Sequence, residues 1–249
     1  MRLKISLSPS VLLLFAAIGA GCAHLGTPST DNLDPRFQVG KVLYSNEFEK
    51  NYGQWITELE KGGTVTIGGG KMEIDVPGGC SVWFRPELIG PVMIEYDATM
   101  IKSGGVNDRV SDLNCFWMAQ DSRSPGDIFA THRTGKFADY DQLRCYYVGL
   151  GGNYNTTTRF RRYIGVQDNR PLLPEDDLSA AQYLLKPNVR QHITLIACGN
   201  LIQYYRDGHK IFELDDPTPY TQGWFAFRTT WNHMVVENFV VRRLDVARP

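Results

Sequence analysis

Residues 201–214 read LIQYYRDGHKIFEL, two runs of strand-forming residues separated by the dipeptide Asp207-Gly208. An Asp-Gly pair in this position is the strongest short-range signal for a β-hairpin, because both central residues can adopt a positive φ. The same rhythm continues in both directions along the chain, where short alternating or β-branched runs are separated by turns rich in glycine. No comparably long run follows the 3.6-residue period of a helix. The sequence therefore predicts an antiparallel all-β protein.

The predicted strands extend over most of the chain. They lie at residues 41–48, 64–67, 71–76, 81–84, 92–100, 113–118, 143–149, 157–164, 192–198, 201–206, 210–214, 223–229 and 234–244. Only residues 174–185 carry helix-starting chemistry, and there we expect one or two turns. So many strands with so little helix must stack two sheets or close a barrel. At this length we predict one domain with the fold of a two-sheet antiparallel jelly-roll sandwich.

The first residues have the layout of a secretory signal peptide, with a basic start, an apolar run at residues 11–18 and then small residues. The apolar run is shorter than the roughly 20 residues of a transmembrane helix. Small residues directly before Cys22 resemble the lipobox of bacterial lipoproteins. The resemblance implies an exported protein that is lipid-anchored to a bacterial membrane through acylated Cys22. Because Gly19 stands where a branched residue is usual, secretion without acylation is the alternative.

The domain boundaries follow from this layout: a signal peptide at 1–21, a tether at 22–38 and the sandwich domain at 39–249. The tether is rich in Pro, Thr, Asp and Asn and shows no apolar period. The formal net charge is −1, and Lys and Arg are scattered. No continuous basic face results, so nucleic acid is not the expected partner. Small molecules or neutral-to-acidic polymers fit this charge better.

Four cysteines follow the predicted tether. They are Cys80, Cys115, Cys145 and Cys198. An even number in an exported chain is compatible with disulfides, but no pair has the CxxC spacing of a metal site. Three of the four lie inside apolar strand-like runs, which is equally typical of buried free thiols.

Two sets of motifs resemble known families. The C-terminal pattern from Tyr205 to Val241, including Gly223–Thr230, resembles concanavalin A-like lectin and glucanase domains. With Asn114–Met118 and Tyr146–Asn155 added, the likeness extends to YesU-like and uncharacterised domains of bacterial polysaccharide-utilisation systems. The resemblance implies a polysaccharide or oligosaccharide partner, often one that contains uronic acids. It implies no required cofactor, although a structural Ca²⁺ is common in the superfamily, with Asp215-Asp216 or Asp176-Asp177 as candidate ligands.

The predicted strand at 157–164 carries the clearest candidate binding residues. Alternate residues of a strand share one face, so Arg159, Arg161 and Tyr163 are expected to line up as hydrogen-bond donors. Such a row could hold the carboxylate of an acidic sugar through charge-assisted bonds. An ordinary solvated sheet face is the alternative.

Further candidates lie next to turns and to the long polar loop at 121–141, which could fold over a groove. Trp117 offers a flat face for a sugar ring, although packing in the core is its alternative role. A histidine side chain has a pKa of ~6.5, which suits proton transfer near neutral pH. His132 in the loop is one candidate base, and His233 is a second. The remaining predicted binding residues are Asn114, Tyr146, Asn153 and Arg228.

Three functions are compatible with these residues. The first is a polysaccharide lyase, in which Arg159, Arg161 or Arg228 neutralises a uronate and Tyr147, Tyr146 or His132 removes the C5 proton. The alternative is a non-catalytic glycan-binding lipoprotein. A glycoside hydrolase ranks third, because the Glu-x-Asp-x-x-Glu strand of the superfamily's hydrolases is missing: Met100 stands where the third acid is expected. Its carboxylates would have to come from separate strands, namely Glu95 or Asp97 with Asp112 or Asp121.

Overall fold

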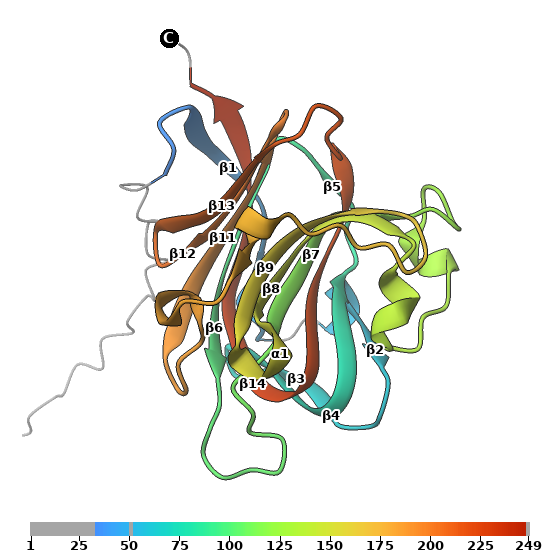
Figure 1. The fold of residues 1–249 in the computed structure, drawn as a ribbon, viewed down its shortest axis with the longest axis vertical. Helices are drawn as coiled ribbons and strands as arrows, with labels where there is room; N and C mark the ends of the chain where they lie inside the picture. The colour runs from blue at the N-terminus through green and yellow to red at the C-terminus, as the bar shows by residue number, and fades with distance from the viewer. Residues whose placement is uncertain (1–32, 50–51, 248–249) are drawn as a thin grey trace, which may run out of the picture.

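The computed structural model describes residues 33–49 and 52–247. The regular structure of this part consists mainly of antiparallel β-strands (Figure 1). The predicted signal peptide, Cys22 and most of the predicted tether lie outside the described residues. Within these residues no helix is long and apolar enough to cross a membrane.

The strands carry the labels of Figure 1. They are β1 (Phe37–Asn46), β2 (Trp55–Leu59), β3 (Thr64–Gly68), β4 (Lys71–Phe84), β5 (Leu88–Ile89), β6 (Val92–Met100), β7 (Leu113–Asp121), β8 (Leu143–Gly151), β9 (Thr157–Ile164), β10 (Asp177–Leu178), β11 (Arg190–Cys198), β12 (Leu201–Arg206), β13 (His209–Asp215) and β14 (Gln222–Val246).

The helical segments are all short. They are the helical turn α1 (Gly152–Asn155) and the 3-10 helices η2 (Tyr52–Gln54), η3 (Ile128–Ala130), η4 (Phe137–Tyr140), η5 (Pro174–Asp176) and η6 (Ala181–Tyr183).

One continuous antiparallel sheet curls so that its two halves face each other. The front half consists of β2, the second part of β4, the first part of β14, β7, β8, β9 and β10. The back half consists of the second part of β14 with the first part of β4, β3, β1, β6, β11, β12 and β13. Strands β4 and β14 therefore belong to both halves. The pairing of β14 shifts register near Trp231 and near Asn238, both of which have positive φ.

The main core fills the space between the two halves. Phe227 lies near its centre, with ring centroids 5.4 Å from Trp55, 4.9 Å from Tyr96, 4.8 Å from Phe225 and 6.1 Å from Phe239. A second apolar cluster lies on the opposite face of the front half; its larger members are Trp83, Phe116, Tyr140, Tyr147, Tyr163 and Trp224. Both faces of the front half are therefore apolar in part, which explains why its strands do not alternate cleanly between apolar and polar residues.

The predicted two-sheet sandwich is confirmed, and so is the hairpin at Asp207-Gly208. Strands β12 and β13 pair across this turn, where both residues have positive φ. All four cysteines of the domain are buried and unpaired, which decides between the two alternatives left open above. The segment at 174–185 forms two single 3-10 turns separated by β10.

The structure joins two pairs of predicted strands, begins β1 at Phe37, and adds β2, β5 and β10, which were not predicted. The strands predicted at 71–76 and 81–84 form one strand, β4, and those at 223–229 and 234–244 form one strand, β14. The glycines and polar residues that separate each pair are accommodated by register shifts, so pairing continues through them.

Candidate functional site

The candidate site lies on the front face, the side of the front half that is turned away from the main core. Register brings residues of neighbouring strands into one row across this face. In order, the row contains Ser81 of β4, Arg228 of β14, Asn114 of β7, Gly149 of β8, Arg159 of β9 and Asp177 of β10. Tyr147 and Arg161 lie side by side in the next row.

The loop at 121–141, called the front loop below, covers part of this face. Its Arg133 has a fully buried side chain that pairs with Asp121 and with Glu58 of β2, at N–O distances of 3.0 and 2.9 Å. The hydroxyl of Tyr140 donates to Glu58 at 2.7 Å. These bonds hold the front loop over the apolar cluster. The arginine-rich part of the face lies beside the loop.

Arg161 is the most informative residue of this part. Its half-buried guanidinium donates to the main-chain carbonyl of Arg170 and forms no ion pair with any described carboxylate. Burial, and then the neighbouring cations Arg159 and Arg170, lower the pKa of Arg161. The carboxylate of Asp177, whose pKa the charge of Arg161 helps to lower, pairs directly with Arg159, so the half-buried guanidinium of Arg161 is suited to an anionic ligand.

The other arginines of the face differ in how they are held. Arg159 forms a two-bond ion pair with Asp177, at 2.8 and 3.0 Å, and its side chain is partly exposed. Arg228 is only 1% exposed; it donates to the carbonyl of Gly135 at 2.7 Å, and its guanidinium lies 4.9 Å from the ring centroid of Tyr140. Arg228 therefore fastens the front loop to the sheet.

Tyr147 lies opposite Arg161 on the neighbouring strand. A Cβ atom added to Gly149 would be 2.9 Å from its hydroxyl oxygen, so the hydroxyl lies over Gly149, between Asn114 and Arg159 in the row. Tyr147 is 6% exposed, and burial raises the pKa of its phenol well above the ordinary value. The hydroxyl is therefore protonated at neutral pH and acts as a donor.

Asp112 lies beside the row, directly before β7 and two residues from Asn114. Its backbone has φ 63°, an uncommon value for a residue other than glycine and one that is frequent at functional sites. Its carboxylate accepts from the hydroxyl of Ser111 at 2.5 Å and from Arg109 at 2.8 Å. Burial raises the pKa of Asp112, and these two partners oppose that rise. The side-chain amide of Asn114 also points to Asp112, at 3.4 Å, while its carbonyl oxygen is buried without a partner among the described residues.

The structure brings most of the predicted site residues to the front face. These are Asn114, Tyr147, Arg159, Arg161, Tyr163 and Arg228, of which Tyr163 and Arg228 are fully buried. Trp117 and Tyr146 face the main core instead, because strand alternation turns them away from Asn114 and Tyr147. Trp117 is completely buried, and the hydroxyl of Tyr146 donates to Asp216 at 2.7 Å. Neither side chain can contact a ligand on the front face.

The two candidate histidines and Asn153 lie outside the row of the front face. His132 is exposed on the front loop, whereas its neighbour Arg133 points inward. His233 lies between Asp108 and Glu73, 2.8 Å from each. Asn153 is exposed in the turn α1.

The carboxylates proposed for hydrolysis come from different faces. Glu95 and Asp97 lie on the outer face of the back half, where they pair with Arg242 and Arg190. Asp112 and Asp121 belong to the front half, where each pairs with an arginine. The structure therefore does not bring a Glu95 or Asp97 carboxylate together with either of them.

Two of the four candidate Ca²⁺ ligands pair with arginines. Asp216 pairs with Arg162 at 2.6 Å, and Asp177 pairs with Arg159. In the described part of the chain no group of three or more His, Cys, Asp or Glu side chains is arranged to hold a metal ion.

Sequence reasoning missed Arg109, Arg170 and Ser111 as parts of this site. All three lie in segments between strands, where no periodicity indicates which way a side chain points. Asp112 was considered only as a hydrolytic acid. The available signal was the clustering of polar residues just before β7.

Comparisons with known proteins agree with this architecture. A family model described as "Domain of unknown function (DUF6250)" matches residues 74–239. No curated protein matches the chain.

Among solved structures, a Bacillus subtilis protein of unknown function with a galectin-like fold has a TM-score of 0.65 at 17% identity, covering 85% of this chain and 100% of its own. The carbohydrate-binding module CBM66 from Bacillus subtilis has a TM-score of 0.52 at 13% identity, covering 78% and 99%. The endo-β-1,3-glucanase from Pyrococcus furiosus has a TM-score of 0.51 at 12% identity, covering 86% and 100%. At these identities the likeness shows the fold, a lectin- and glucanase-type sandwich as predicted.

Proposed function

Because the chain belongs to the DUF6250 family, a domain family of unknown function, we propose its function from the site itself: it binds an acidic glycan on the front face. The observation that carries this proposal is the guanidinium of Arg161, half-buried, without a described carboxylate partner and flanked by Arg159 and Arg170. A guanidinium fork matches the geometry of a carboxylate and can bind it through two parallel hydrogen bonds. Uronic acids supply that carboxylate on every sugar ring.

Two further features support a sugar as the carrier of the charge. The same sandwich occurs in a carbohydrate-binding module and in a β-1,3-glucanase, as reported above. The resemblance to YesU-like domains adds uronic-acid glycans of the pectin type to the candidates. These likenesses indicate that the ligand is a sugar, and the arginines indicate that it carries a negative charge.

Isothermal titration calorimetry tests this proposal. Oligogalacturonides are titrated into the domain, with neutral gluco-oligosaccharides of the same length as the comparison. The acidic series is expected to bind more tightly, and Arg161→Gln should weaken it about ten-fold or more, because charge-assisted hydrogen bonds contribute about 1.5–3 kcal/mol. The control is Arg243→Gln, an exposed arginine near the end of β14 that pairs only with Asp245. Equal affinity for acidic and neutral chains, or an unchanged Arg161→Gln variant, would contradict the proposal.

A second candidate is β-elimination in an acidic glycan. Here Arg161 neutralises the uronate, a base removes the C5 proton, the C4–O bond breaks, and the departing oxygen takes up a proton. Tyr147 lies close enough to Arg161 and Arg228 for their charges to oppose the rise of its pKa, which is the observation that favours it as the base or acid. Burial raises the pKa of Tyr147 more than the two arginines lower it, so its phenol does not readily lose a proton. Binding without catalysis is therefore the first candidate.

Ultraviolet absorbance separates the two candidates, because elimination creates a conjugated unsaturated uronate. Acidic polysaccharides are incubated with the domain, with Tyr147→Phe and with His132→Ala. A rise in absorbance that disappears in Tyr147→Phe supports the lyase. Binding in the calorimeter without any rise leaves glycan binding as the function.

We also propose that Cys22 is acylated and that the protein acts at a bacterial membrane surface. The support is the sequence alone, since Cys22 lies outside the described residues. Mass spectrometry of the mature N-terminus tests it. A free or absent Cys22 would indicate secretion without an anchor.

A further inference from the structure

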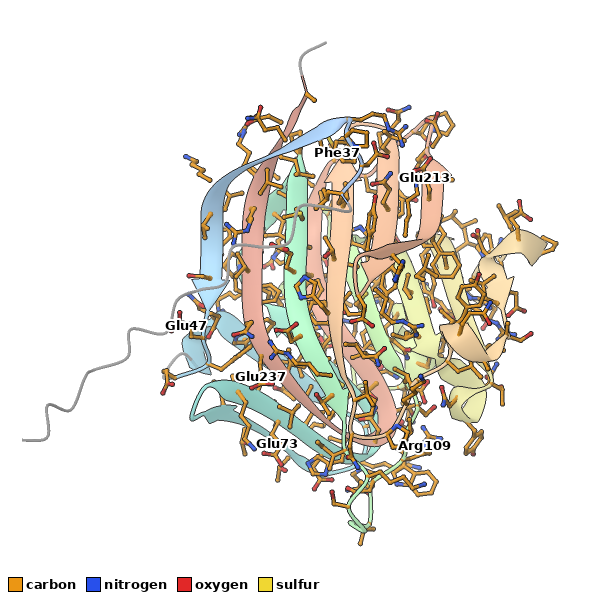
Figure 2. All side chains as sticks on the ribbon, turned by 90° about the vertical axis from the view of Figure 1, so that its left-hand side faces the viewer. Phe37, Glu47, Glu73, Arg109, Glu213 and Glu237 are labelled. Carbon is orange, nitrogen blue, oxygen red and sulfur yellow. The ribbon has the colours of Figure 1, made fainter. Side chains whose placement is uncertain are left out.

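An exposed pair of aromatic residues lies next to the arginine site. Tyr154 in the turn α1 is 72% exposed, and Trp231 at the bend of β14 is 41% exposed. The guanidinium of Arg109 lies over both rings, 4.8 Å from the centroid of Tyr154 and 5.1 Å from that of Trp231. Figure 2 shows Arg109 at the lower end of the sheet, the end opposite Phe37 and Glu213.

Arg109 connects this pair to the site described above. Its Nε donates to the carbonyl of Trp231 at 2.7 Å, and its Nη2 donates to the carboxylate of Asp112 at 2.8 Å. It also donates to the carbonyl of Thr230. Asp112 in turn lies beside Asn114 in the row of the front face. The two rings are therefore held at the edge of the front face where β7 begins.

The exposure of these rings is unusual for this chain. The other four tryptophans are at most 6% exposed, whereas Trp231 is 41% exposed. Tyr154 and Trp231 also have left-handed backbone conformations, with φ 61° and 35°. Bulky residues rarely adopt such values, which cost of order 1–3 kcal/mol each. These backbone conformations hold two partly exposed rings beside each other under one guanidinium.

The distance between the rings and Arg161 indicates the size of the ligand. Tyr154 lies in the turn that precedes β9, and Arg161 is four residues beyond Thr157, the first residue of that strand. At ~3.3 Å per residue the separation along the strand is roughly 13 Å. A backbone span of that length is longer than one sugar ring, so an oligosaccharide is better suited than a monosaccharide to contact both places.

We propose that Tyr154 and Trp231 form an aromatic platform that stacks on a sugar ring of the same glycan chain whose carboxylate binds Arg161. The inference rests on the proposed function and narrows it: the ligand is an oligosaccharide, not a monosaccharide. One face of each ring contacts Arg109, and the exposed remainder is available to the apolar face of a pyranose. Arg109 is a positioning residue, because its donors are directed to Trp231, Thr230 and Asp112.

The experiment combines chain length with fluorescence. Galacturonic acid and its oligomers of increasing length are titrated into the wild-type domain and into Tyr154→Ala, Trp231→Ala and Trp231→Phe. Wild-type affinity should rise with length, and the two alanine variants should lose about three- to ten-fold for the longer oligomers only, the size expected of one or two aromatic contacts. Trp231→Phe keeps a ring and should lose less. Val42→Ala, which alters an apolar side chain that is 46% exposed on β1 of the back half, is the matched control.

Fluorescence quenching gives an independent measurement, because Trp231 is the exposed tryptophan. A long oligomer should protect it from acrylamide, whereas the monosaccharide should not. Arg109→Gln should increase quenching of the free protein, since one face of the ring is uncovered.

The outcomes separate this proposal from the previous one. If oligogalacturonides bind with dependence on Arg161 while the platform variants bind normally and Trp231 stays unprotected, the platform is overturned and the binding function stands. If no acidic glycan binds the wild-type domain, both are overturned. If Tyr154→Ala or Trp231→Ala instead converts a dimer to a monomer in analytical ultracentrifugation, the rings form a contact between copies of the chain, and the platform is again overturned.

Discussion

His192 on the outer face of the back half lies among buried acids. Its Nδ1 is 2.8 Å from Asp97, and its Nε2 is 3.6 Å from Glu95; both carboxylates are 5% exposed. Figure 2 shows the strands of this half. Hydrogen bonds to Asp97 and then to Glu95 raise the pKa of His192 to about 9. At neutral pH the imidazole is therefore a cation that shares these two buried carboxylates with Arg190 and Arg242.

This histidine predicts a pH dependence of stability. A group whose pKa is higher in the folded state stabilises fully below its unfolded pKa of ~6.5, and its contribution is lost as pH rises towards 9. Thermal unfolding followed by circular dichroism between pH 6 and 9.5 should show a larger decline of Tm for the wild type than for His192→Gln. His209→Gln, an exposed histidine of the β12–β13 turn, should behave as the wild type. Parallel curves for all three proteins would contradict the assignment.

The front loop is the element on which the site depends most. It approaches the sheet closely at Gly79, where an added Cβ would lie 2.2 Å from the carbonyl oxygen of Gly135. The ion pairs of Arg133 and the hydrogen bond from Arg228 to the loop also hold it to the sheet. A long polar segment is thus fixed by buried charges. The loop thereby covers the apolar cluster and leaves the arginines at its margin.

Replacing the buried Arg133 should release the front loop from the sheet. In Arg133→Met, Asp121 and Glu58 lose a partner inside the protein, and breaking a buried ion pair from one side costs about 3–5 kcal/mol. Urea denaturation should show that loss in the free energy of unfolding, and limited proteolysis should cut the variant within residues 121–141. Lys136→Met, an exposed position of the same loop, should change neither result. A stable variant with an intact loop would show that the network does not hold it.

Across the whole molecule, alternation in the sequence predicts which strand residues share a face. It does not predict which of the two faces they occupy, because that depends on tertiary contacts. Alternation was sufficient to place Arg159 and Arg161 on one face. Tyr146 and Tyr147 were both proposed for the site, although adjacent strand residues point to opposite faces, and only the register of β8 decides which one reaches it.

The aromatic platform could not be predicted at all. Arg109, Tyr154 and Trp231 come from three separate parts of the chain, and the fold brings them together only where the β8–β9 turn meets the bend of β14. No local pattern carries that information, because loops have no period.

Strand β14 makes the two halves one cooperative unit, and this leads to the last prediction. Phe227 is fully buried on this strand and contacts aromatic residues from both halves of the sheet. Phe227→Ala should lower the free energy of unfolding by about 3–5 kcal/mol. Because β14 pairs with β4 and β7 in front and with β6 and β1 behind, the front half cannot unfold while the back half persists.

Coincident transitions are therefore expected for wild type and variant alike. Tryptophan fluorescence reports on the front half, where Trp83, Trp117 and Trp224 are buried, and far-ultraviolet circular dichroism reports on all strands. Val166→Ala, at a half-exposed position outside the strands, is the control and should leave the midpoint unchanged. Two separate transitions in Phe227→Ala would mean that each half can fold alone, and that β14 connects the halves without coupling them.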